Sequence, residues 1–195
     1  MLFDSHTHIQ FPAYDSDRDE VVSRAIQAGV KMIAVGTQIE SSAAAIALAE
    51  KYPQDIWATV GFHPGHALPA IALSEGGSGS WRHDKSEQAQ AAPEKFDVTA
   101  LRKLASHPKV VAIGECGLDY FRIGDKEKAT SDKGGAIKEE QRRVLLAQVE
   151  LAKELNKPLM IHARASKGTD DAYEDVIKII SSLRDCEAVE AIPYS

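Results

Sequence analysis

Cysteine is scarce in this chain, and so are aromatic residues and long apolar runs. Cys116 and Cys186 are the only two cysteines among 195 residues, too few for the disulfide framework of a small secreted domain. We therefore expect a reducing, cytoplasmic setting. Cys116 ends an apolar run and is expected to be a small buried side chain rather than a nucleophile. The sequence shows neither a signal-peptide pattern nor an apolar run of transmembrane length, so no membrane partner is expected.

Positive charge is also in deficit. The 23 lysines and arginines are outnumbered by 29 aspartates and glutamates, which gives a formal net charge of −6. This balance argues against a broad basic surface that wraps duplex nucleic acid. It still allows a nuclease in which metal ions and a few arginines meet the phosphates locally.

The remaining composition is that of a globular protein. A hydrophobic content of 44% over 195 residues predicts one domain spanning residues 1–195 with a substantial core. A polar stretch rich in glycine, serine and glutamine, at about 74–93, is predicted to be a flexible surface insertion. A second polar loop is predicted at 123–136.

Apolar, β-branched runs alternate with amphipathic stretches along the chain. Strands are predicted at residues 2–9, 30–36, 56–62, 110–115 and 158–163. Helices are predicted at residues 15–27, 41–51, 99–106, 137–155 and 170–183, the first closed by Gly29 and the second capped by Ser41. Continuous apolar strands separated by helices are typical of a buried parallel sheet. The predicted fold class is α/β, either an open doubly wound sheet or a (β/α)8 TIM-type barrel, and both carry their chemistry at the carboxyl ends of the strands.

Histidine and carboxylate side chains gather at these carboxyl ends. His6 and His8 end the first strand one residue apart, and alternate side chains of a strand share a face. Two adjacent imidazoles are an arrangement that binds a divalent metal ion. Glu115 follows a wholly apolar run, where a lone buried carboxylate would be costly, and His162 follows another such run. These four residues are predicted to be metal ligands.

The remaining histidines point less clearly to chemistry. For His63, contact with a substrate phosphate and a structural role in its loop are both open, because Pro64 turns the chain away from the strand. His66 is predicted to be structural, and His83 and His107 are predicted to be solvated. Three aspartates near the start of the last helix are predicted to serve as its cap and its exposed surface: Asp170, Asp171 and Asp175.

Four segments together resemble the TatD family of metal-dependent deoxyribonucleases, in the amidohydrolase-like barrel superfamily. They are FDSHTH at residues 3–8, VGFHP at 60–64, IGECGLDY at 113–120 and PLMIHAR at 158–164, and the EEQR run at 139–142 is similar as well. The resemblance implies a distorted (β/α)8 barrel with two or three divalent ions (Mg, Mn or Zn) at its C-terminal rim. It implies hydrolysis of phosphodiester bonds by a 3′-to-5′ exonuclease that acts on DNA ends and single-stranded regions.

The same resemblance implies a role for each matching residue. His6 and His8 would bind the first metal. Glu115 would bridge two metals, and His162 would bind the second. The residues implied to lie near the substrate phosphate are His63, Tyr120, Arg122 and Arg164, and the implied catalytic side chains are Glu115 and His63. Arginine suits such a position because guanidinium pairs with phosphate in a two-pronged geometry.

The sequence also departs from this family. A (β/α)8 barrel usually takes about 250 residues, and only five strands are predicted. The family's metal histidine after strand six and its aspartate after strand eight have no counterpart here. Three explanations are open: a fragment of a longer product, a short form sealed by oligomerisation, or a homologue without turnover. Because a five-stranded piece would expose two apolar edges, we favour a fragment or a chain completed by a partner.

Other functions stay open beside the nuclease. The chain is either an enzyme or a catalytically incomplete metal- or nucleotide-binding module that needs a partner chain. Within the same superfamily, an esterase or deacylase would use the same metal-binding residues on a different ester. The identity of the metal cannot be read from a mixed set of histidine and carboxylate ligands.

Overall fold

The computed structural model describes residues 2–67, 94–123 and 132–182, apart from the side chains at 122, 132 and 133. The predicted insertion at 74–93, His83 and Cys186 lie outside the described residues. In chain order the elements are β1 (Leu2–Thr7), η1 (Pro12–Tyr14), α1 (Arg18–Gln27), β2 (Val30–Val35), α2 (Ile39–Lys51), β3 (Ile56–Val60), α4 (Val98–Ala105), β4 (Val110–Asp119), η2 (Phe121–Ile123), α6 (Asp132–Glu154), β5 (Leu159–Arg164) and α7 (Asp171–Ser182).

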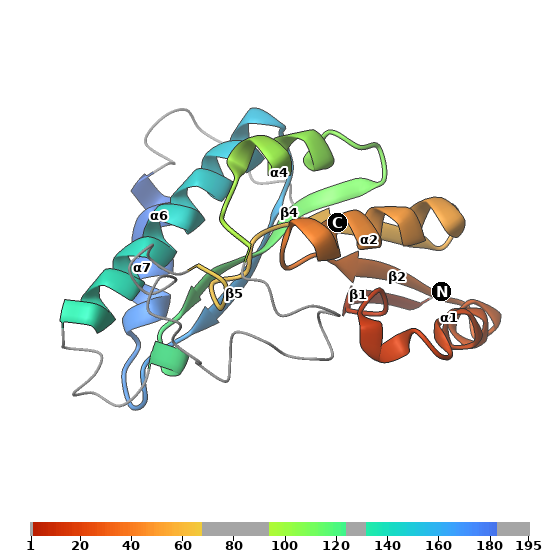
Figure 1. Cartoon of the computed structure of the whole chain (residues 1–195), viewed down its shortest axis with the longest axis horizontal. Coiled ribbons are helices and arrows are strands. Elements are labelled where there is room, and N and C mark those ends of the chain that lie inside the picture. Colours follow the sequence, from red (N-terminus) through yellow and green to blue (C-terminus); the bar gives the residue numbers. More distant parts are fainter. Residues whose placement is uncertain (1, 68–93, 124–131, 183–195) are drawn as a thin grey trace, which may run out of the picture.

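The five strands form one parallel sheet in the order β1-β2-β3-β4-β5 (Figure 1). A doubly wound sheet reverses its strand order at a switch point, whereas a (β/α)8 barrel adds each strand beside the previous one in a single direction. The sequential order therefore decides between the two predicted folds. The strands and helices form a curled half-barrel, that is, five β/α units of a TIM-type barrel, and the predicted fold class is confirmed.

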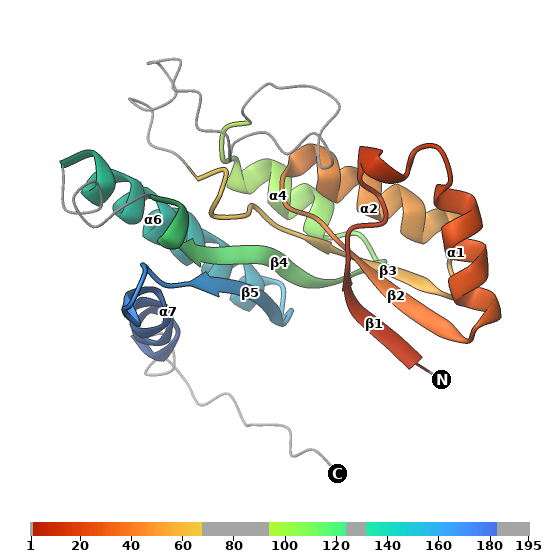
Figure 2. The same cartoon turned by 90° about the horizontal axis from the view of Figure 1, so that it is seen from below.

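The helices pack on one side of this sheet. Figure 2 shows α2, α4 and α6 along that side, with α1 near the β1 end and α7 beside β5. A first core, built around Ile56 and Ile113, joins the middle strands to α1, α2 and α4. A second core joins β4 and β5 to α6 and α7 through side chains such as Cys116, Leu118 and Leu145. Cys116 is fully buried, as predicted.

Helix ends are set by residues that can satisfy the free backbone groups there. α1 ends just before Gly29, whose φ of 75° is a left-handed conformation that glycine adopts readily, as predicted. α2 begins earlier than predicted, so Ser41 is its third residue rather than its cap. The Ser41 hydroxyl accepts the backbone N–H of Gln38 at 2.9 Å. The carboxylate of Glu94 accepts the N–H of Ile39 at 2.7 Å, which satisfies a helix donor that has no partner within the helix.

Two further boundaries differ from the prediction. β4 runs to Asp119 rather than ending at Glu115, because Gly114 and Gly117 continue the strand with positive φ values. α6 begins at Asp132, so residues 132–136 of the predicted loop are helical. Each of the two glycines in that stretch costs a helix about 1 kcal/mol. Residue 134 is nevertheless buried, and tertiary packing overrides the weak local preference.

β1 and β5 form the two edges of the sheet that the structure describes. β1 is exposed along most of its length, with Leu2 67% and Phe3 51% exposed. Of the two apolar edges expected from the sequence, β1 is exposed and apolar only at Leu2 and Phe3, and β5 is half-buried from Leu159 to Ala163. Among the described helices, none combines the length and the apolar character needed to cross a membrane.

Candidate metal centre

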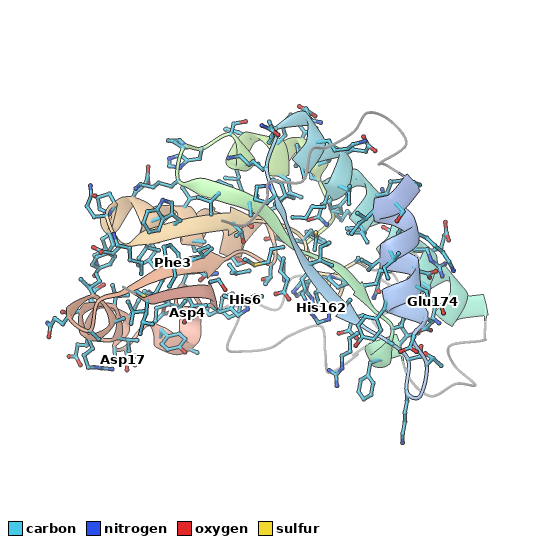
Figure 3. All side chains as sticks on the ribbon, turned by 180° about the vertical axis from the view of Figure 1, so that it is seen from behind. Phe3, Asp4, His6, Asp17, His162 and Glu174 are labelled. Atoms are coloured by element: carbon cyan, nitrogen blue, oxygen red, sulfur yellow. The ribbon has the colours of Figure 1, made fainter. Side chains whose placement is uncertain are left out.

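Glu115 lies at the centre of a group of four histidines. Its carboxylate is contributed by β4 and the residue is only 8% exposed. Oε2 lies 3.4 Å from Nε2 of His6 and 3.9 Å from Nε2 of His8. Oε1 lies 3.2 Å from Nδ1 of His162 and 3.9 Å from Nε2 of His63. Figure 3 shows His6 and His162 reaching toward the same region from β1 and β5. One carboxylate thus serves two triads of metal-ligand type.

Strand alternation explains why these groups share a face. Cys116 and Leu118 of β4, and Tyr120 just after its end, pack against the helices, so the intervening positions face the inner side of the sheet. Glu115 and Asp119 are both on that inner side. His162 of β5 pairs with residue 117, between them, and its ring contacts both carboxylates. Nε2 of His162 lies 3.2 Å from Oδ2 of Asp119.

Asp119 is the residue of this centre to which the sequence argument gave no role. It is fully buried in β4. The signal was present in the sequence, because Asp119 follows Glu115 at a spacing of four, which places both on one face of a strand. The predicted strand ends at residue 115, before Gly117, and therefore leaves Asp119 outside it.

The hydrogen bonds of His8 fix which of its nitrogens faces Glu115. Nδ1 of His8 lies 3.0 Å from the carbonyl oxygen of Val35 and must donate to it, since a carbonyl only accepts. In the neutral ring the lone pair is then on Nε2, the nitrogen that lies 3.9 Å from Oε2 of Glu115. Such a hydrogen bond from the distal nitrogen is the usual support of a metal-binding histidine. Gln10 donates to the same carbonyl at 2.7 Å.

His63 has the opposite arrangement. Its Nδ1 accepts the backbone N–H of Gly65 at 3.0 Å. A neutral imidazole that accepts through one nitrogen carries its proton on the other. Nε2 of His63 is therefore a donor, and it faces Oε1 of Glu115 and the ring of His162, 4.5 Å away between centroids. This arrangement suits a group that donates a hydrogen bond to an anion better than it suits a metal ligand.

The charges of the centre shift the pKa values of its members. Burial alone would raise the pKa of the Glu115 carboxyl, but the hydrogen bond to His162 and the electrostatic interactions with His63 and His6 lower it to about 2. Burial would lower the pKa of His162, but the carboxylates of Asp119 and Glu115 raise it to about 9. The Glu115 carboxylate is therefore ionised at neutral pH, which is the state that a metal ligand requires.

Two glutamines of α6 hold the ends of the neighbouring strands. Gln141 accepts the N–H of Asp119 at 2.9 Å and donates to the carbonyl of Pro64 at 3.2 Å. Gln148 lies two turns later on the same helix face and bonds both backbone groups of Phe62, at 2.7 and 3.0 Å. Both glutamines are buried. They fix β3 and β4 against each other next to His63 and Asp119.

Tyr120 does not reach this centre. Its side chain is fully buried, and its hydroxyl donates to Oδ2 of Asp175 on α7 at 2.9 Å. Burial, with this hydrogen bond, raises the pKa of the Tyr120 hydroxyl. The implied contact with a substrate phosphate is therefore not available in this arrangement. The prediction that Asp175 belongs to the exposed surface of the helix is wrong as well, because its carboxylate also accepts two hydrogen bonds from Arg142.

The other predicted positions lie around or outside the centre. Arg164, at the end of β5, is exposed and lies over the ring of Phe121. The backbone of Arg122 is in η2, but its side chain lies outside the described part. His66 contacts Gln38 and belongs to neither triad. His107 was predicted to be solvated, but it pairs with Glu50 at 3.2 Å.

The start of α7 differs from the prediction at one aspartate. The Asp171 side chain accepts hydrogen bonds from the N–H and hydroxyl of Ser166, at 2.9 and 2.8 Å, so it orders the loop after β5 in addition to starting the helix. Asp170 remains exposed.

A cavity of about 530 Å³ lies apart from these histidines. It is lined by Gln10, by residues 15–17 between η1 and α1, by the start of α1 and by one face of α2. No member of either triad borders it. The volume of this cavity is therefore not what identifies the candidate functional site. The site is identified by the histidines that converge on Glu115.

Comparison with known proteins agrees with this geometry. A family model described as "TatD related DNase" matches residues 3–192. The chain belongs to the TatD-related DNase family. The matched range contains the whole candidate metal centre. Within it, β4 carries Glu115 and Asp119, and the ends of β1, β3 and β5 carry the histidines.

Individual relatives extend the comparison. The "3'-5' ssDNA/RNA exonuclease TatD" of Salmonella typhimurium is 34% identical over 185 residues, which are 94% of this chain and 55% of that protein. The "uncharacterized metal-dependent hydrolase YabD" of Bacillus subtilis is 34% identical over 193 residues, 98% of this chain and 58% of that protein. The crystal structure of YjjV, a TatD homologue from Escherichia coli K12, has a TM-score of 0.60 at 28% identity and covers 91% of this chain and 56% of that chain. The chain thus spans about half the length of these relatives.

Proposed function

We propose that this chain contributes the metal centre of a metal-dependent hydrolase that cleaves phosphodiester bonds, as a 3′-to-5′ exonuclease on DNA ends and single strands. Its membership of the TatD-related DNase family supports this proposal. Relatives at 34–36% identity are named 3'-5' ssDNA/RNA exonucleases, which places single-stranded RNA beside DNA among the substrates to be tested.

The observation that carries the proposal is the sharing of Glu115 between two triads. Each oxygen of the carboxylate is directed to a different pair of histidines: Oε2 to the β1 pair and Oε1 to His63 and His162. A carboxylate used in this way can hold two cations a few ångströms apart, and two adjacent cations are the arrangement that serves in-line displacement at phosphorus.

The donor set fits divalent cations. His6 and His8 with one oxygen of Glu115 form the first proposed site, and His162 with the other oxygen forms the second. Imidazole nitrogen with carboxylate oxygen accommodates zinc and manganese, and magnesium is bound where carboxylate dominates. We propose two or three such ions, and the triads support at least two. In the second site Nδ1 of His162 faces Glu115, and Nε2 of the same ring contacts the carboxylate of Asp119. A carboxylate that contacts the distal nitrogen in this way orients a metal-binding histidine.

Divalent ions held here would supply a nucleophilic water at neutral pH and would neutralise charge on the phosphoryl oxygens. The chain's own groups have the remaining tasks. Glu115 provides a fixed negative charge that positions both sites. His63, as a donor through Nε2, would hydrogen-bond a non-bridging oxygen of the substrate phosphate. Arg164 is exposed at the end of β5 and would bind phosphate from the solvent side.

A second candidate function is favoured by two observations. The chain spans about half the length of its relatives, and the edge strand β1 exposes Leu2 and Phe3. A catalytically incomplete module that binds metal or nucleotide and acts through a partner chain would have this appearance. It predicts metal binding without turnover by the isolated chain.

The test is release of nucleotides from single-stranded DNA labelled within the strand, with Mg²⁺ or Mn²⁺ and with EDTA. The 195-residue chain is compared with His6→Ala/His8→Ala and with His107→Ala, whose ring contacts Glu50 outside the triads. Metal-dependent release that is lost only in the double variant supports the nuclease. Bound metal without release supports the incomplete module, and unchanged metal content in the double variant rejects the site. Native mass spectrometry of the same samples measures any oligomer.

A further inference from the structure

Phe121 and Arg164 form a contact at the rim that the proposed metal sites do not explain. Cζ of Arg164 lies over the Phe121 ring, 3.8 Å from its centroid. Phe121 is 44% exposed, and Arg164 is exposed as well. Because both groups stay in solvent, their contact buries little apolar area and contributes little to the stability of the fold.

The sheet register places this pair beside the metal centre. Arg164 is the ladder partner of Asp119, and its carbonyl accepts the N–H of Tyr120 at 2.8 Å. Arg164 follows His162 by two residues, so both side chains leave the same face of β5, roughly 6.6 Å apart along the strand. Phe121 opens η2, two residues after Asp119. The pair therefore lies next to the metal centre, two residues beyond His162 on β5 and two residues beyond Asp119 on β4.

The guanidinium of Arg164 rests on the Phe121 ring. Among the described residues, its side chain makes neither a hydrogen bond nor an ion pair, and the ring is its one cation–π partner. Its in-plane N–H groups are therefore available to an anion while one of its faces rests on Phe121. Aromatic rings and guanidinium planes are the surfaces on which proteins stack the unpaired bases of single-stranded nucleic acids.

Resting on the proposed function, we propose that Phe121 and Arg164 form a stacking platform for the nucleobase that adjoins the phosphate at the metal centre. In this arrangement Phe121 touches the substrate, and Arg164 stacks on a base in addition to contacting a phosphate. The platform would recognise the π-face of any unpaired base and would not distinguish one base from another.

The experiment measures binding, so that it does not depend on turnover. Three single-stranded oligonucleotides with a 5′ fluorophore and phosphorothioate terminal linkages are compared by anisotropy in Mn²⁺. One is unmodified, and the others carry an abasic residue at the last or the next-to-last position. The 195-residue chain is compared with Phe121→Leu, which keeps apolar volume without the ring, and with Phe121→Tyr, which keeps the ring. Tyr173→Leu removes another exposed aromatic side chain, on α7, as a matched control.

The unmodified strand should bind the unsubstituted chain roughly 5- to 100-fold more tightly than one of the abasic strands, the range expected for a single base–aromatic stack. Phe121→Leu should remove this preference, while Phe121→Tyr and Tyr173→Leu should keep it. Equal binding of all three strands, no binding of any strand, or an unchanged preference in Phe121→Leu would each overturn the platform. The nuclease assay tests the proposed function separately from the platform. Hydrolysis without a preference for the unmodified strand would support the proposed function and reject the platform. A preference for the unmodified strand without hydrolysis would support the platform and reject the nuclease activity of this chain.

Discussion

Gly117 lies directly opposite His162 in the ladder between β4 and β5. A Cβ at this glycine would lie 1.8 Å from the carbonyl oxygen of His162, and its φ of 146° is one that other residues rarely adopt. The missing side chain allows the backbone of β4 to approach the backbone of β5 closely at His162. This close approach brings the strand that carries Glu115 and Asp119 next to the residue whose ring contacts both carboxylates.

Gly117→Ala should lower the free energy of unfolding by at least about 2 kcal/mol, because both the contact and the backbone conformation must change. Metal affinity should fall with it. The matched control is Gly135→Ala in α6, where a Cβ meets nothing within 4 Å. That variant should be neutral or gain about 0.5–1 kcal/mol from helix propensity. Urea unfolding of the metal-free proteins measures both, and equal values for the two variants would contradict the close approach.

Glu115→Gln should weaken both proposed metal sites, whereas His6→Ala should weaken only the first. The amide keeps the shape of the side chain but loses the charge that serves both triads, and we expect a loss of at least about tenfold in affinity at each site. Elemental analysis after dialysis against limiting Mn²⁺ or Zn²⁺ counts the ions per chain. If Glu115→Gln and His6→Ala lose the same number of ions, the carboxylate is not shared.

The residues at the strand ends gave the sequence-based prediction of the candidate site. His6, His8, Glu115 and His162 each follow an apolar run, and parallel strands bring their carboxyl ends to one rim, so their convergence followed from the pattern alone. Their metal-binding role stays a prediction. The choice of a barrel over an open sheet did not follow from the same pattern, because strand order is a tertiary property that alternating strands and helices leave undetermined.

Asp119 and Tyr120 show where the local pattern was insufficient. The glycines at 114 and 117 are typical of a strand end, but here they permit close strand pairing, which is visible only once β5 is in place. The family resemblance implied that Tyr120 lies near phosphate, yet its position on the helix-facing side of β4 carries it toward Asp175 of α7. Both cases depend on contacts more than 40 residues away in the sequence.

Asp119→Asn should weaken the second proposed metal site and leave the first unchanged. Asp119 is not a member of either triad, but its carboxylate contacts Nε2 of His162 and orients the ring. Loss of such a partner typically costs about 10- to 100-fold in metal affinity. Competition with a chromogenic chelator at limiting metal separates the two sites. Asp119→Glu, which restores the charge with a longer side chain, should recover part of the loss, and an unchanged second site in Asp119→Asn would reject the positioning role.

Tyr120→Phe should affect stability and leave catalysis intact. The variant removes the hydroxyl that donates to Asp175 while Arg142 keeps its bonds to the same carboxylate, so we expect a loss of about 1–2 kcal/mol in the free energy of unfolding. Thermal and urea unfolding measure this loss, and nucleotide release measures kcat/KM. A drop of more than tenfold in kcat/KM with unchanged stability would instead mean that the Tyr120 hydroxyl reaches the substrate.

Asp171 should make the loop after β5 sensitive to acid. Burial would raise the pKa of its carboxyl, but hydrogen bonds from Lys138, Ser166 and Thr169 lower it well below its ordinary value of 3.8. A carboxyl whose pKa is lowered by folding stabilises the folded state above its unfolded pKa, and this contribution disappears as the pH falls through the folded pKa. Asp171→Asn should therefore cost a constant free energy of unfolding from pH 8 down to about 5, and the cost should shrink below pH about 4. Urea unfolding across this range, with Asp170→Asn as the exposed control, makes the comparison. A cost that is the same at pH 3 and pH 7 would mean that the charge of Asp171 does not contribute.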